Sequence, residues 1–100
     1  MFYLGGIVMR LMLKFVIPVE KGNQAAADGS MMQVIQELIG KLQPESTYFY
    51  LQEGKRAGTI IFKATDQSQM VVINEPLFAK LHAEIEIQPA LDLEDLTRAL

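Results

Sequence analysis

Residues 47–64 read TYFYLQEGKRAGTIIFKA, and they decide the fold because they predict two strands joined by a tight turn. In residues 47–52 the two tyrosines share one face, and residues 58–64 also alternate with a period of two, which is typical of half-buried strands. Residues 53–56 contain a glycine that suits a turn. The middle of the chain is therefore predicted to form an antiparallel hairpin.

On the N-terminal side of the hairpin, the pattern predicts a strand, a loop and a helix. Residues 11–19 have apolar side chains at every odd position, which predicts a strand. Residues 21–29 are polar or small and are predicted to be a loop. A helix is predicted to begin at Ser30, with Gln33 completing a capping box, and to stop before Pro44.

On the C-terminal side, the pattern predicts a second helix, a fourth strand and a short last helix. The second helix is predicted to begin near Asp66 and to break near Asn74, restarting with Pro76 in a first turn because proline lacks an N–H donor. Residues 83–88 alternate as a strand, and Asp92 is placed to cap the final helix.

This order of elements indicates the α+β class. Strand, helix, strand, strand, helix, strand is the order of the ferredoxin-like βαββαβ plan, with a four-stranded antiparallel sheet and two helices on one face. We expect a single domain over residues 11–100 that ends with the short helix, because 100 residues is near the common domain size.

The first residues allow several interpretations. Residues 1–17 are apolar, but Arg10 and Lys14 interrupt them, which disfavours a secretory signal or a membrane span. Alternatively, translation begins at Met9 or Met12. We therefore expect residues 1–10 to be a mis-assigned or flexible extension, and the protein to be cytoplasmic and bacterial.

Composition excludes several kinds of chemistry. The net charge is −3 and the nine basic residues are scattered, which argues against a nucleic-acid partner. There is no cysteine and a single histidine, which excludes disulfides, cysteine nucleophiles and cysteine-ligated zinc. No phosphate-binding glycine motif is present, and we expect neither a metal nor a cofactor.

The sheet face not covered by helices predicts a partner. It would carry a mixture of apolar, aromatic and charged residues: Lys14, Val16, Tyr48, Tyr50, Ile61, Lys63, Glu84 and Glu86. A second copy of the chain would bury the tyrosines and pair the lysines with the glutamates, so we expect a homodimer through this face. The alternative is a monomer whose open face is solvated.

Four segments carry a family resemblance: residues 14–22 (KFVIPVEKG), 74–78 (NEPLF), 83–89 (AEIEIQP) and the closing residues 92–96 (DLEDL). They resemble an uncharacterised bacterial branch of the dimeric α+β barrels, a superfamily that includes muconolactone isomerase-like enzymes and antibiotic-biosynthesis-type monooxygenases. The resemblance implies the ferredoxin-like fold and a dimer. It implies no catalytic residue, because no enzyme motif of the larger group is recognisable.

Six residues are candidates for a site, each with a structural alternative. His82 is the single histidine of the chain and a candidate general base, or it interacts with a helix C-terminus. Glu84 and Glu86 are paired carboxylates that could hold a metal or act as acid and base at a ligand site. Alternatively, they form an ion-paired stripe in an interface. Tyr48 and Tyr50 line a ligand pocket, or pack across a dimer. A break at Pro76 would open a cleft beside Leu77, Phe78 and Leu81, which makes Phe78 a candidate ligand contact.

Three classes of function follow from these features. The leading hypothesis is a small homodimer that binds a small apolar molecule or serves as an accessory module. The second is a cofactor-independent isomerase or monooxygenase that uses His82 or a tyrosine to move protons. The third is a purely structural dimerisation module, so whether the chain is an enzyme stays open.

Overall fold

The computed structural model describes residues 9–100, and the expectations for residues 1–8 lie outside this range. The elements are β1 (Met9–Ile17), α1 (Val19–Asp28), α2 (Ser30–Leu42), β2 (Ser46–Gln52), β3 (Lys55–Ala64), α3 (Gln69–Leu81), β4 (Glu84–Pro89) and α4 (Leu93–Ala99). The α+β class is confirmed. All four predicted strands are present, and Met9 and Arg10 are the first residues of β1.

The four strands form one sheet in the order β2-β3-β1-β4, and every neighbouring pair is antiparallel. The central hairpin is confirmed, with Tyr48 opposite Thr59 in the β2–β3 register. Glu53 and Gly54 both have positive φ, as the two central residues of a tight hairpin turn require. Because β2 and β4 are the edges, residues on these two strands lie at opposite sides of the molecule.

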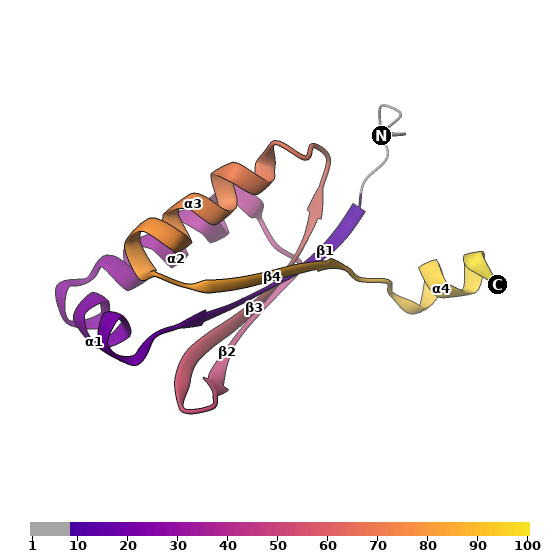
Figure 1. The fold of residues 1–100 in the computed structure, drawn as a ribbon. Helices are drawn as coiled ribbons and strands as arrows, with labels where there is room; N and C mark the ends of the chain where they lie inside the picture. The colour runs from indigo at the N-terminus through magenta and orange to yellow at the C-terminus, as the bar shows by residue number, and fades with distance from the viewer. Residues whose placement is uncertain (1–8) are drawn as a thin grey trace.

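The core lies between one face of the sheet and the helices α1, α2 and α3 (Figure 1). Every second residue of the central strands β1 and β3 points into it, as the period of two predicts. The largest fully buried side chains are Phe15, Phe62, Leu13, Ile17, Ile60, Ile73, Leu77 and Leu81. The helix-facing side of the sheet was therefore identified correctly from the alternation.

Helix α1 replaces the loop that was predicted over residues 21–29, and that prediction is wrong. Pro18 stands at the N-cap, where its missing N–H costs nothing, and the alanines after Gln24 favour a helix. Gly22 and Ala25 are the buried residues of α1, so its contact face is made of small side chains rather than of a large apolar stripe. The sheet face therefore carries three helices, not the two expected.

The predicted capping box at the start of α2 is also absent. The N-cap is Gly29 at φ 84°, and Ser30 donates its backbone N–H to the Asp28 carboxylate at 2.8 Å. Because α1 ends directly before α2, the chain reverses at a left-handed glycine and not at a serine cap. Helix α2 ends at Leu42, as predicted from Pro44.

Helix α3 runs without a break through Pro76, so the predicted break near Asn74 is wrong. Ile73, Leu77 and Leu81 are at most 2% exposed, and their spacing of four places them on one face of a continuous helix. Burying this stripe against the sheet offsets the hydrogen bond that the proline removes.

Helix α4 is capped by Asp92 as predicted, with a full capping box to Asp95. It projects from the end of the sheet, away from the other three helices (Figure 1). Its leucines are exposed, including Leu93 at 78% and Leu96 at 44%. Apolar packing onto the domain therefore contributes little to the position of α4.

Candidate functional site

A cleft of about 440 Å³ lies between α2 and the β2–β3 side of the sheet. We call it the α2–β2 cleft. Its walls are mostly apolar and come from four elements: Phe15 and Ile17 of β1, Met31, Met32, Ile35, Gln36 and Ile39 of α2, Phe49 and Tyr50 of β2, and Arg56 and Ala57 of β3.

The cleft exists because the helix layer is narrower than the sheet. Phe49 points to the helix side, since a side chain added at Gly58 would meet both Phe49 and the buried Phe15. Even so, Phe49 is 54% exposed and Leu51 is 73% exposed, because no helix extends over the β2 edge. An apolar strip of the helix-side face therefore remains open beside α2.

Arg56 is the charged residue in the wall of the cleft. It stands opposite Ile17 in the β1–β3 register, on the helix side of the sheet, and it is half-buried. Its Nη1 atom donates to the side-chain oxygen of Asn23 in α1 at 3.0 Å. Within residues 9–100, no carboxylate lies within ion-pair distance of Arg56.

Of the two candidate tyrosines, only Tyr50 lines the cleft. Tyr48 and Tyr50 share the open face of β2, as the alternation predicts, and the Tyr50 hydroxyl is hydrogen-bonded to the Thr59 hydroxyl. Tyr48 is 61% exposed on this face. Both tyrosines therefore belong to the open face of the sheet. Tyr50 also lies at the rim of the cleft.

His82 is the C-cap of α3, with φ 53°, and its backbone N–H donates to the carbonyls of Leu77 and Phe78. The exposed ring lies just before β4, which is the sheet edge opposite β2. Phe78 is half-exposed on α3 and is not part of the cleft wall. The structure thus does not bring His82 or Phe78 together with the tyrosines.

Glu84 and Glu86 are exposed on β4, on the open face of the sheet. In the β1–β4 register, Glu86 stands opposite Lys14 and Glu84 opposite Val16. The two carboxylates therefore lie along the outer edge of the open face, on the side away from the tyrosines.

The cleft expected beside Pro76 does not form, because α3 is continuous there. A small hollow of about 10 Å³ lies between α2 and α3, lined by residues that include Val34, Pro76 and Leu77. That is room for about one water molecule. The space large enough for an organic ligand lies on the other side of α2.

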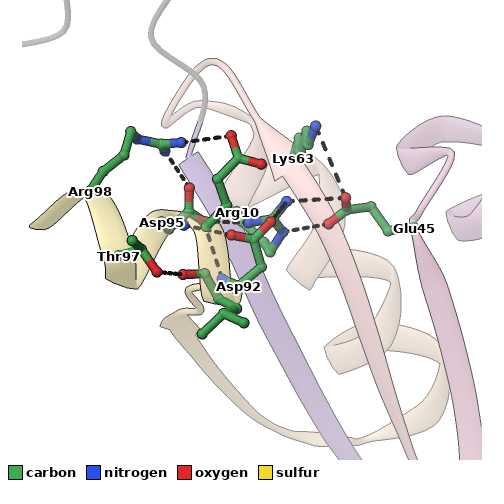
Figure 2. Close-up of polar contacts among 9 residues, drawn as sticks. Arg10, Glu45, Lys63, Asp92, Asp95, Thr97 and Arg98 are labelled. Carbon is green, nitrogen blue, oxygen red and sulfur yellow. Dashed lines mark hydrogen bonds and ion pairs between the residues drawn. The ribbon is translucent and has the colours of Figure 1, made fainter.

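A second polar cluster surrounds Arg10 at the end of β1 (Figure 2). Its guanidinium contacts Glu45 at 2.6 Å, Asp92 at 3.3 Å and also Asp95, so it links β1 to α4 and to the segment before β2. Hydrogen bonds from Arg10 lower the pKa of Glu45. The pKa of Asp95 is lowered first by its hydrogen bond from the Asp92 backbone N–H and then by Arg98 and Arg10.

Arg10 occupies the centre of this cluster, so its acidic residues are already paired. Among residues 9–100, no group of three or more histidine or acidic side chains is arranged to hold a metal ion. No helix in that range has the length and apolar character needed to cross a membrane. The ion pairs of Arg10 with Asp92 and Asp95 attach α4 to the sheet.

Sequence reasoning missed most of the α2–β2 cleft. Arg56 was assigned to the turn over residues 53–56, and Met31 and Met32 were not predicted to belong to a site. These residues come together in one cleft because of the position of α1 and because no helix covers the β2 edge. Local sequence patterns predict neither feature. The available signal was the pair of methionines, because flexible apolar side chains suit variable binding surfaces as well as cores.

No known family model matches the chain, and no curated protein matches it. Among solved structures, it is similar to the uncharacterized protein TM1266 from Thermotoga maritima, with a TM-score of 0.57 and 16% identity over 85% of this chain and 100% of that chain. The de novo designed protein Ferredog-Diesel matches with a TM-score of 0.44 and 14% identity, over 88% of this chain and 90% of the design. The likeness to TM1266 supports the α+β fold.

Proposed function

We propose that this chain is a small cytoplasmic homodimer that binds a small, largely apolar molecule in the α2–β2 cleft. The observation that carries the proposal is the cleft itself. Its volume of about 440 Å³ falls within the range of roughly 300–1,000 Å³ that is usual for small-molecule sites. Its walls combine apolar side chains with a few polar groups, which is the usual composition of such sites.

The physical drive for binding is the apolar surface that water now contacts. Met32 is 58% exposed and Phe49 is 54% exposed, on opposite sides of the cleft. An apolar ligand between them would remove this surface from water, which stabilises by about 25 cal/mol per Å². The floor, formed by Phe15 and Ile17, is fully packed, so little ordering would be needed on binding.

For the assembly, we propose the ferredoxin-like arrangement and the sheet-to-sheet dimer of the α+β barrels. The order β2-β3-β1-β4, antiparallel throughout, is the one this arrangement requires. Lys14 faces the same side as Tyr48 and Glu86. A second copy related by a two-fold axis would bury the tyrosines and bring the lysines of one sheet toward the glutamates of the other.

An isomerase or monooxygenase function has weaker support. His82, the residue best suited to proton transfer, lies beside β4, whereas the cleft lies beside β2. A catalytic base should stand within hydrogen-bond reach of the bound substrate. Among the candidate residues, Tyr50 alone lines the cleft, and its hydroxyl is bonded to Thr59 on the open face of the sheet.

The test is binding of a neutral apolar probe, 1-octanol. Binding is measured by calorimetry and by the shift in the midpoint of thermal unfolding. Met32→Glu places a charge at the cleft in an exposed position, so we expect the fold to persist and octanol binding to be lost. Val71→Glu is the matched control, since Val71 is 63% exposed on α3 outside the cleft.

We expect saturable binding and a raised midpoint for the wild type and for Val71→Glu, because a ligand of the folded state stabilises it by mass action. Absence of saturable binding to the wild type would favour the purely structural module. Equal binding to Met32→Glu would move the site elsewhere on the protein.

A further inference from the structure

We infer that the molecule bound in the α2–β2 cleft is an apolar carboxylate, whose charged group pairs with Arg56. This inference rests on the proposed function and adds the class of ligand. The inference follows from the position of the Arg56 guanidinium, from its hydrogen-bond partner and from the apolar side chains around it.

Arg56 is held on the helix side of the sheet by close packing against α1. A β-carbon added at Gly22 would lie 2.8 Å from Arg56 Nη1 and 3.4 Å from its Cδ. The side chain therefore extends across the surface of α1 at the one buried position where that helix has no side chain. Asn23 accepts from Nη1 at 3.0 Å and fixes the orientation further.

The three arginines of the chain differ in their partners. Arg10 contacts three carboxylates, and Arg98 contacts Glu94 and Asp95. The guanidinium of Arg56 donates a side-chain hydrogen bond only to the neutral amide of Asn23, and it forms no ion pair, among the residues that the structure describes. Its positive charge is thus uncompensated, although it is half-buried beside the apolar side chains of Ile17 and Met31.

An anionic group of a ligand in the cleft would pair with the positive charge of Arg56. A guanidinium presents five N–H donors in a planar fork that matches a carboxylate, and Asn23 occupies one of them. Charge-assisted hydrogen bonds of this kind are about twice as strong as neutral ones. The remaining wall is apolar except for Gln36 and Tyr50, whose hydroxyl is bonded to Thr59 on the open face, so the wall favours a ligand with one charged end and an apolar body.

The experiment compares octanoate with 1-octanol, which have the same apolar chain and differ in the charge of the head group. Binding is measured by calorimetry at neutral pH on the wild type, on Arg56→Met and on Lys55→Met. Methionine keeps the apolar stem and removes the charge. Lys55→Met removes an adjacent charge from the opposite face of the strand and serves as the control.

We expect the wild type and Lys55→Met to bind octanoate about tenfold more tightly than octanol, since a hydrogen bond to a charged group contributes about 1.5 kcal/mol or more. Arg56→Met should bind the two probes equally. Gly22→Ala, which displaces the guanidinium without removing it, should lower the preference while leaving octanol binding unchanged.

Two results would overturn the inference separately from the proposed function. Equal affinity of the wild type for both probes would leave an apolar site with no role for the charge. A preference for octanoate that survives in Arg56→Met would place the carboxylate elsewhere. Absence of binding by either probe would remove both the proposed function and this inference.

Discussion

At the scale of single residues, Gly58 determines how closely β3 packs under the aromatic side chains. A β-carbon there would lie 2.5 Å from Phe15 Cζ and 3.1 Å from Phe49 Cδ1. Phe15 is 1% exposed, so its ring would have to shift within the packed core to admit the added methyl group. We expect Gly58→Ala to lower the free energy of unfolding by about 1–3 kcal/mol, the usual cost of overpacking a core. Urea denaturation measures the change.

Gly40→Ala is the matched control for that prediction. Gly40 lies in α2, and an added β-carbon there meets nothing within 4 Å. The free energy of unfolding should rise by up to about 1 kcal/mol, because alanine favours a helix over glycine. A neutral Gly58→Ala beside a stabilised Gly40→Ala would contradict the close packing of Phe15 on β3.

At the scale of elements, α3 contains a residue that disfavours a helix, Pro76, and an apolar face whose burial favours one. Proline inside a helix removes one hydrogen bond and clashes with the preceding turn. In a continuous α3 this cost is present in the folded state, so Pro76→Ala should raise the free energy of unfolding by about 1–3 kcal/mol. Urea denaturation again gives the value. A destabilised Pro76→Ala would instead indicate that the proline supports a helix start.

Helix α4 tests the role of the Arg10 cluster. Because its leucines are exposed, the ion pairs with Asp92 and Asp95 hold α4 to the sheet (Figure 2). We expect Arg10→Met to remove the protection of α4 amides from hydrogen exchange while the protection of β1 and β3 stays. Arg98→Gln, which affects pairs within α4, is the control. Unchanged protection of α4 in Arg10→Met would show that another contact holds it.

Acid should release α4 in the same way. Glu45 and Asp95 have pKa values below their ordinary values of 4.5 and 3.8, so their ionised forms are favoured in the folded state. A lowered pKa contributes stability above the ordinary value, and this contribution is lost as the pH falls through the folded pKa. Of the two, Asp95 belongs to α4, so we expect α4 amide chemical shifts to move toward unfolded values below about pH 3.8, while the shifts of the core stay. Shifts that are constant down to pH 2 would contradict this.

At the scale of the whole molecule, the open sheet face is the surface for the proposed dimer. Tyr48 is 61% exposed on this face, so Tyr48→Glu should leave the fold intact and convert a dimer to a monomer in sedimentation experiments. Leu93→Glu is the control, because Leu93 lies on α4. A dimer that persists in Tyr48→Glu and is lost in Leu93→Glu would assign the contact to α4 instead.

The strands and the hairpin were predictable because their information is local. Alternation at β1 and β3 fixes which side chains face the core, and Glu53-Gly54 fixes the turn. The N-cap at Asp92 was predictable for the same reason. In each case a few neighbouring residues specify the geometry, so no knowledge of distant parts of the chain was needed.

The candidate site was much less predictable. Tyr50 was named from its place on a strand, and the structure puts it at the rim of the cleft. Arg56 was missed because its position depends on Gly22, and Gly22 lies in a helix that has no large apolar stripe. The placement of His82 away from the cleft depends on sheet order, which brings β4 and β2 to opposite edges.

Residue types and short periods in the sequence were enough to predict the α+β class, the strand faces and the absence of cysteine chemistry. Tertiary structure alone decided that residues 19–28 form a helix, that α3 runs through Pro76, and that β2 stays uncovered. Each of these depends on burial against distant segments. Burial free energy exceeds local preference at those positions, and local patterns do not record it.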